Sequence, residues 1–209
     1  MLTVLVLALA IVAVWFFVFK GKKNEGTGLP KPEPIAVSKH SAAFNESMQE
    51  MMQAYYAMTE AFVNWDTSAV SQASLSLQSA IDSLKMQEMQ QDTLLFPTVV
   101  AQWDGVKAEI AGLVSDPDLG EKRASLNILS QQIFDLLRIV RYDVAKVYFQ
   151  ECPMALNNYQ VPGNWLSGSK EVRNPYLGMK DPEYGSKMLN CGGPKDTLNY
   201  VAPESNPQP

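Results

Sequence analysis

The middle of the chain carries apolar side chains at helical spacing. From residue 40 onward they recur every three or four positions, which places them on one face of a helix. Four stripes of this kind follow one another, at residues 44–62, 70–84, 99–113 and 119–140. Polar or proline-containing breaks near Trp65, Pro97 and Pro117 separate the stripes. This pattern predicts four amphipathic helices with short connections, an up-down four-helix bundle over residues 39–145.

The N-terminus is an apolar segment. Residues 2–19 contain Thr3 as their only polar member, and as a helix they would span about 27 Å, near the lower limit for crossing a bilayer. The segment ends in aromatic residues and then Lys20, Lys22 and Lys23, without a small-x-small cleavage site. We therefore predict an uncleaved membrane anchor over residues 1–19, with a cleaved signal peptide as the alternative. The positive-inside rule places these lysines in the cytoplasm, which conflicts with the exported domain that the C-terminal residues indicate.

The remaining segments lack a helical period. Residues 20–38 are rich in glycine and proline and predict a flexible linker, and residues 203–209 predict a disordered tail. Residues 147–152 are rich in β-forming side chains and predict a short strand, after which proline, glycine, asparagine and aromatic residues alternate. The expected fold class is all-α: the bundle, the N-terminal membrane anchor, and an irregular Cys/Met segment at 146–202 that packs on the bundle and can contain short strands.

Composition narrows the function classes. The chain has 209 residues and a formal net charge of −5, whereas a nucleic-acid binder normally presents a basic face. Its single histidine, His40, excludes multi-histidine zinc sites and argues against a serine or cysteine triad. No base, nucleophile and orienting group can be assembled from these residues. We therefore expect neither nucleic-acid binding nor enzymatic activity.

Two sulfur pairs lie in the C-terminal segment. Cys152 and Met154 are two positions apart, so their side chains point to the same side of an extended chain. Met188 and Cys191 can converge in the same way on a turn, because the glycines that follow let the backbone bend. Four sulfur ligands favour a soft monovalent ion such as Cu(I) or Ag(I). Two cysteines in an exported segment most often form a disulfide, and this alternative stays open on the residues alone.

Four sequence strings of the C-terminal third occur in a recognisable order. They are YFQECPMA (148–155), WLS (165–167), EVRNPYLG (171–178) and MLNCG (188–192). With the run that begins at Glu121-Lys122-Arg123, they resemble an uncharacterised bacterial periplasmic helical domain, found alone or fused to membrane-fusion adaptors of Cus-type copper/silver efflux systems. The resemblance covers about residues 39–200. It implies an exported domain with a soft-metal site and a metal efflux complex as partner. The implied ligands are Cys152, Met154, Met188 and Cys191.

The chain departs from the family pattern at two places. In a related heavy-metal-binding motif a histidine follows the methionine, whereas Ala155 stands there in this chain and removes a nitrogen ligand. Residues 179–185 lengthen the run before Met188 and can shift it relative to Cys152. The predicted function is a periplasm-facing Cu(I)/Ag(I)-binding domain of metal efflux or homeostasis, anchored in the inner membrane or exported if the N-terminus is cleaved. The alternative is a disulfide-stapled structural or interaction domain of the cell envelope with no metal role.

Overall fold

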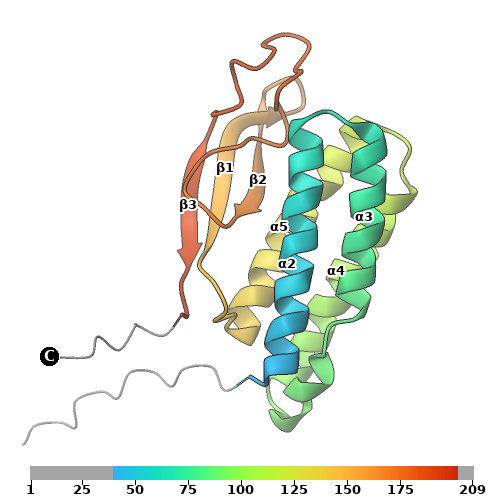
Figure 1. Cartoon of the computed structure of the whole chain (residues 1–209), viewed down its shortest axis with the longest axis vertical. Helices are drawn as coiled ribbons and strands as arrows, with labels where there is room; N and C mark the ends of the chain where they lie inside the picture. Colours follow the sequence, from blue (N-terminus) through green and yellow to red (C-terminus); the bar gives the residue numbers. More distant parts are fainter. Residues whose placement is uncertain (1–39, 202–209) are drawn as a thin grey trace, which may run out of the picture. The chain divides into compact units, whose positions relative to one another are not determined.

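Four α-helices form a bundle. The computed structural model describes residues 40–201. Its helices are α2 (Ala42–Val63), α3 (Thr67–Asp82), α4 (Phe96–Ser115) and α5 (Leu119–Val140), with a short 3-10 helix, η1 (Met86–Gln91), between α3 and α4 (Figure 1). Each α-helix coincides with one of the four apolar stripes of the sequence.

Three predicted segments lie outside the described residues. They are the membrane anchor at 1–19, the linker at 20–38 and the tail at 203–209. Within residues 40–201, none of the helices combines the length and the apolar character that crossing a membrane requires. The anchor therefore stays a prediction from the sequence.

Local sequence signals set where the helices begin. Ser41, Asp66 and Asp118 precede α2, α3 and α5, and each side chain accepts a hydrogen bond from the backbone N–H three residues ahead, at 3.1, 2.9 and 2.9 Å. Helix α4 instead has Pro97 in its first turn, where an N–H would have no helical partner in any case. These caps and the proline explain the breaks between the apolar stripes.

Methionines fill much of the bundle core. A flexible thioether adapts to irregular gaps between helices. Six methionines of α2 and η1 are at most 9% exposed: Met48, Met51, Met52, Met58, Met86 and Met89. These six residues therefore pack the core, and the two methionines predicted as ligands, Met154 and Met188, lie elsewhere in the chain.

The fold class is not all-α, because the C-terminal segment forms a sheet. Its three strands are β1 (Val147–Leu156), β2 (Val161–Ser167) and β3 (Gly193–Leu198). They make one antiparallel sheet in the order β2-β1-β3. The prediction of an all-α chain with an irregular segment at 146–202 is therefore wrong: the chain combines four helices with a three-stranded sheet.

The short strand predicted at 147–152 is the first part of β1, whereas proline and asparagine concealed β2 and β3 in the sequence. Pro162 and Pro194 lie in β2 and β3, the edge strands, where a residue without an N–H is tolerated. Asn157, Asn158 and Tyr159 turn the chain from β1 to β2 with φ values of 48°, 52° and 64°. Asparagine adopts this left-handed conformation more readily than most residues. β3 pairs with β1 only after a long loop, so no local pattern marks it as a strand.

The sheet packs on the side of the bundle formed by α2 and α5 (Figure 1). The Tyr55 hydroxyl lies 2.6 Å from the Ser130 hydroxyl and accepts a hydrogen bond from the Leu166 N–H at 3.0 Å, so it joins α2, α5 and β2. Phe134 of α5 stacks on Phe149 of β1, with ring centroids 4.5 Å apart. Helices and sheet therefore share one core.

A Tyr55→Phe substitution tests this junction. It leaves the buried Leu166 N–H without its acceptor and removes a partner of Ser130, so the free energy of unfolding in urea falls by about 1–3 kcal/mol. Tyr56→Phe is the control, because no hydrogen bond of the Tyr56 hydroxyl occurs within residues 40–201, and we expect a change within about 0.5 kcal/mol. Equal losses in the two variants would contradict the role of the Tyr55 hydroxyl.

Candidate functional site

The two cysteines are bonded to each other. Cys152 is buried in β1, and Cys191 ends a tight turn in which its N–H donates to the Met188 carbonyl at 2.9 Å. A disulfide joins the two cysteines, whose Cα atoms lie 5.5 Å apart. Of the two alternatives that the sequence left open, the structure contains the disulfide. Both sulfurs predicted as thiolate ligands are therefore engaged in a covalent bond.

The two predicted thioether ligands lie on the segments that the disulfide joins. Met154 follows Cys152 on β1, and Met188 precedes Cys191 on the turn; both methionines are partly buried against the core. In the described range, 40–201, no three His, Cys, Asp or Glu side chains gather closely enough to hold a metal ion. The four predicted residues therefore belong to two joined segments, with the cysteines in the oxidised state.

A glycine is required beside the disulfide. Gly192 has a φ of +117°, and a Cβ at this position would collide with the Glu151 carbonyl of β1. This close approach lets β3 begin directly after Cys191 and pair with β1, where Glu151 is opposite Gly193. The tight bend expected at these glycines therefore serves strand pairing.

Asn174 holds the loop between β2 and β3. Its fully buried side chain accepts hydrogen bonds from the Tyr176 and Leu177 N–H groups at 2.8 and 3.1 Å. The same side chain donates to the Cys191 carbonyl at 3.1 Å. Asn174 and the disulfide therefore fix one loop, residues 168–192, next to the sheet.

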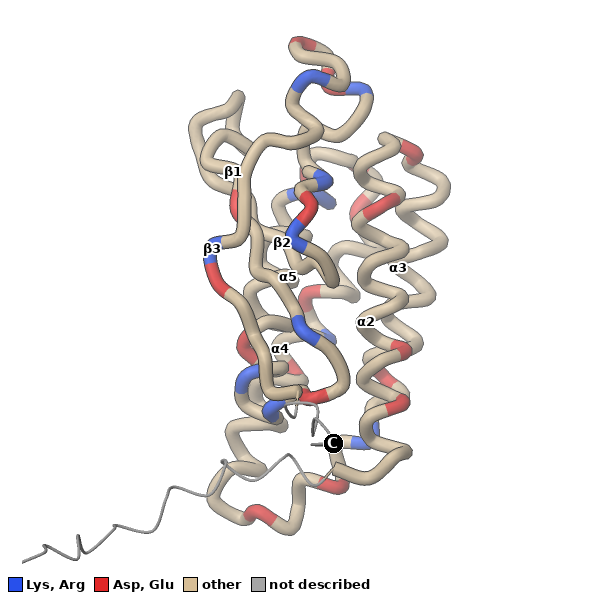
Figure 2. Tube along the Cα trace, turned by 60° about the vertical axis from the view of Figure 1, so that its left-hand side comes forward, with Lys and Arg blue, Asp and Glu red and all other residues tan. Residues whose placement is uncertain are grey.

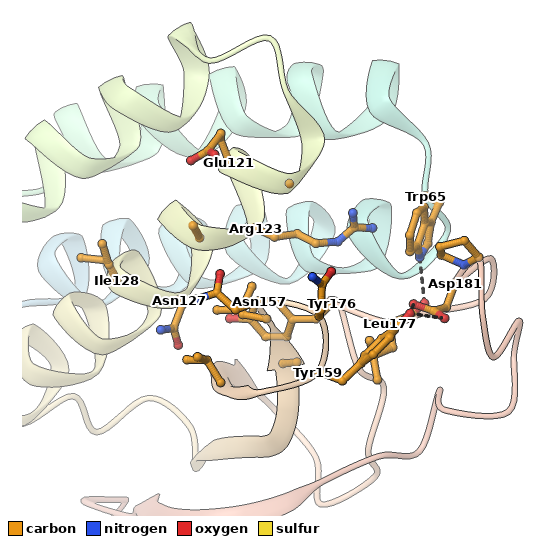
Figure 3. Close-up of a pocket in the computed structure, with 17 residues that line it drawn as sticks. Trp65, Glu121, Arg123, Asn127, Ile128, Asn157, Tyr159, Tyr176, Leu177 and Asp181 are labelled. Carbon is orange, nitrogen blue, oxygen red and sulfur yellow. Dashed lines mark hydrogen bonds between the residues drawn. The ribbon is translucent and has the colours of Figure 1, made fainter.

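This loop forms one wall of a cavity beside the start of α5. The cavity has a volume of about 590 Å³. Helix α5, the α2–α3 connection, the β1–β2 turn and the loop all contribute side chains to it, among them Arg123, Asn127, Trp65, Tyr159, Tyr176 and Asp181 (Figure 3). Four segments that are distant in sequence thus meet around one space.

Arg123 is the cation of this cavity. Its guanidinium lies over the Trp65 ring, with Cζ 3.9 Å from the centroid, and the residue is only 7% exposed. Burial lowers the pKa of Arg123 to about 10, and the charges of Asp181 and Asp118 oppose this effect, so the group stays protonated at neutral pH. Nε and Nη2 are buried, and neither has a hydrogen-bond partner among residues 40–201. Arg123 is therefore a buried charge that these residues do not pair directly.

The Asp181 carboxylate is engaged by its own loop. It accepts hydrogen bonds from the Tyr159 hydroxyl at 3.1 Å and from the Glu183 and Tyr184 N–H groups at 3.0 and 2.8 Å. Burial and this hydrogen bond raise the pKa of Tyr159 to about 12. Asp181 belongs to residues 179–185, which therefore supply part of the cavity wall.

Arg123 was not among the predicted site residues, although the sequence held a signal. Lys122 and Arg123 occupy the positions between Leu119 and Leu126 where the fourth stripe calls for apolar side chains. The Lys122 ammonium donates to the Leu113 carbonyl at the end of α4, which accounts for its burial. The described part of the chain offers Arg123 no such acceptor. An arginine in an apolar stripe was therefore the available indication of a site.

One protein family matches the helical part of the chain. The family is described as Protein of unknown function (DUF3347), and the match covers residues 51–143. The matched residues begin within α2 and end just after α5, so this part of the chain is similar to an uncharacterised domain and is helical, as expected. No curated protein and no solved structure matches the chain.

Proposed function

We propose that this chain is a disulfide-stapled binding module of the cell envelope, which holds a ligand or partner without catalysing a reaction. The observation that carries the proposal is the Cys152–Cys191 bond. Disulfides persist in oxidising compartments such as the periplasm and are rare in the reducing cytosol. The bond ties β1 to the loop that walls the cavity, so its role is to preserve a binding surface.

The construction of the loop supports a binding role. Long connections without helices or strands are uncommon in compact domains and are usually functional. Residues 168–192 are held by the disulfide and by Asn174, and they contribute Tyr176, Leu177 and Asp181 to the cavity. A wall that is ordered before a ligand arrives lowers the entropy cost of binding.

Thiol labelling tests the proposal. The full chain, purified without reductant and alkylated under denaturing conditions, is expected to carry no label by mass spectrometry, and two labels after reduction. The Cys152→Ser/Cys191→Ser chain is the control and stays unlabelled in both conditions. Two free thiols in protein taken directly from cells would contradict the proposal that Cys152 and Cys191 form a stabilising disulfide.

We propose soft-metal binding by the reduced chain as a second candidate function. It is favoured by the placement of Met154 and Met188 on the two segments that the disulfide joins. Two equivalents of a cellular thiol would reduce the bond and themselves form a disulfide. The released pair of thiolates would then lie beside two thioethers, a donor set that favours Cu(I) or Ag(I). This candidate agrees with the resemblance of the sequence to domains fused to Cus-type efflux adaptors.

An anaerobic Cu(I) competition titration tests the second candidate. We expect the reduced full chain to bind one equivalent of Cu(I), and the oxidised chain and the Cys152→Ser/Cys191→Ser chain to bind none. Met154→Leu combined with Met188→Leu weakens binding, whereas Met58→Leu in the bundle core leaves it unchanged, because only Met154 and Met188 belong to the two segments that the disulfide joins. If the reduced wild-type chain binds no Cu(I) while its circular dichroism is unchanged, this candidate is wrong.

A further inference from the structure

The buried donors of Arg123 have no acceptor within the described chain. Nε and Nη2 lie on one edge of the guanidinium, and both are buried without a hydrogen-bond partner in residues 40–201. Arg173, by contrast, donates to Glu60 at 2.9 Å, and Lys122 donates to a backbone carbonyl. Burying a cation without a partner is unfavourable, and such a group calls for a specific explanation. A ligand with two hydrogen-bond acceptors and a negative charge would satisfy both buried donors and balance the charge of Arg123.

The Nε–Nη2 edge fits a carboxylate. Two parallel N–H groups on one guanidinium edge match the two oxygens of a carboxylate, which gives a bidentate, charge-assisted pair. Arg123 lines the cavity (Figure 3), and pairing its buried Nε–Nη2 edge with a ligand requires the flexible side chain to turn toward the open space. The first turn of α5 also lines the cavity at Gly120, and the start of a helix carries partial positive charge.

The charges around the cavity limit the ligand to a single negative charge. Arg123 is the only basic residue among those that line it, and Glu121 and Asp181 are acidic. Figure 2 shows lysine and arginine positions interspersed with acidic ones over the described helices and strands. A phosphate dianion would face these carboxylates with one cation to balance it. A monoanionic carboxylate meets less of this repulsion, because its charge is half as large.

Part of the cavity wall is apolar. Ile128 of α5 is 49% exposed and Val161 of β2 is 37% exposed, and both line the cavity together with Leu156. Large aliphatic side chains left in contact with water on both sides of one opening favour an apolar ligand. The carboxylate is therefore expected to be attached to an apolar body.

We propose that the cavity between α5 and the β1–β2 turn binds the carboxylate of an apolar acid, with Arg123 pairing the carboxylate and Ile128 and Val161 contacting the apolar body. The acid is either a free organic acid or the C-terminus of a peptide with an apolar last residue. This inference rests on the proposed binding function and names the chemistry of its ligand.

Matched acids and amides test the proposal on the purified full chain. Isothermal titration with 3-phenylpropionate is expected to show binding, with 3-phenylpropionamide weaker by about tenfold or more, because the amide loses the charge and one acceptor. The peptide acetyl-Gly-Phe-Leu is measured with a free C-terminus and as its C-terminal amide. It tests whether the natural ligand is a peptide C-terminus or a free organic acid. Tighter binding of the peptide acid than of 3-phenylpropionate assigns the site to a chain terminus, and the reverse order assigns it to a free acid.

Variants locate the site. Arg123→Gln is expected to weaken binding of the acid by about tenfold or more, and to remove the difference between acid and amide. Arg138→Gln, an exposed arginine on the same helix, is the control and leaves binding unchanged. Ile128→Ser is expected to weaken binding of acid and amide alike, because it alters only the apolar contact.

Several results would overturn the proposal. They are equal affinity of acid and amide for the wild-type chain, no binding of either probe at millimolar concentration, and unchanged affinity in Arg123→Gln. The comparison of acid with amide uses the wild-type chain, so it stands even if an Arg123 variant fails to fold. A negative result would leave the thiol-labelling outcome as it is, so failure of this inference is distinguishable from failure of the proposed function.

Discussion

Removal of the Cys152–Cys191 disulfide is expected to lower the free energy of unfolding by about 4 kcal/mol. The two cysteines are 39 residues apart, and opening a loop of this length restores conformational freedom mainly to the unfolded chain. In a domain of this size the melting temperature falls by about 8–16 °C. Thermal denaturation of the full chain, followed by circular dichroism with and without reductant, measures the effect.

The matched variant for this prediction is Cys152→Ala/Cys191→Ala. It should melt near the temperature of the reduced wild-type chain and should no longer respond to reductant. A response to reductant that persists in the double variant would show that the reductant acts elsewhere. An unchanged melting temperature in the reduced wild-type chain would show that the bond adds no stability.

An Asn174→Ala substitution is expected to lower the free energy of unfolding by about 3 kcal/mol. The fully buried side chain makes three hydrogen bonds to backbone groups of Tyr176, Leu177 and Cys191. Alanine leaves all three groups without this partner, and buried polar groups without partners are costly. Urea denaturation measures this loss of unfolding free energy. Comparing it with the loss caused by removing the disulfide shows how much each of the two contributes to holding the loop in place.

Asn190→Ala is the control for this second prediction. Asn190 lies in the same loop, is exposed, and makes no side-chain hydrogen bond within the described residues, so its removal should change stability by less than about 0.5 kcal/mol. We also expect Asn174→Ala to weaken binding in the cavity, since Tyr176 and Leu177 line it. A loss of stability equal to that of Asn190→Ala would mean that the loop is held by other contacts.

The redox state of the cysteines separates the two proposed functions. With the disulfide formed, the sulfurs hold the loop and the cavity wall in place. With the disulfide reduced, the same sulfurs become candidate ligands for Cu(I) beside Met154 and Met188. The thiol-labelling experiment therefore measures whether the cysteines are oxidised, and the Cu(I) titration measures what the same cysteines bind when they are reduced.

The helices could be predicted from the sequence because their signals are local. A stripe of apolar residues such as Phe44 to Phe62 repeats within one helix, and a cap such as Asp66 contacts a backbone group three residues away. Of the sheet, only the start of β1 could be predicted in the same way, from the β-forming residues 147–152. Its edge strands contain Pro162 and Pro194, and β3 is defined by pairing with β1 across a long loop.

By itself, the sequence determined the four helices and offered two cysteines and two methionines as candidate ligands, whereas Lys122 and Arg123 in an apolar stripe were a signal that none of the sequence predictions used. Tertiary structure alone decided that the cysteines are bonded, that Lys122 finds a carbonyl, and that Arg123 faces a cavity without an acceptor from residues 40–201. The physical reason is distance: each outcome depends on atoms from segments far apart in the chain, and no local pattern specifies how closely such segments approach.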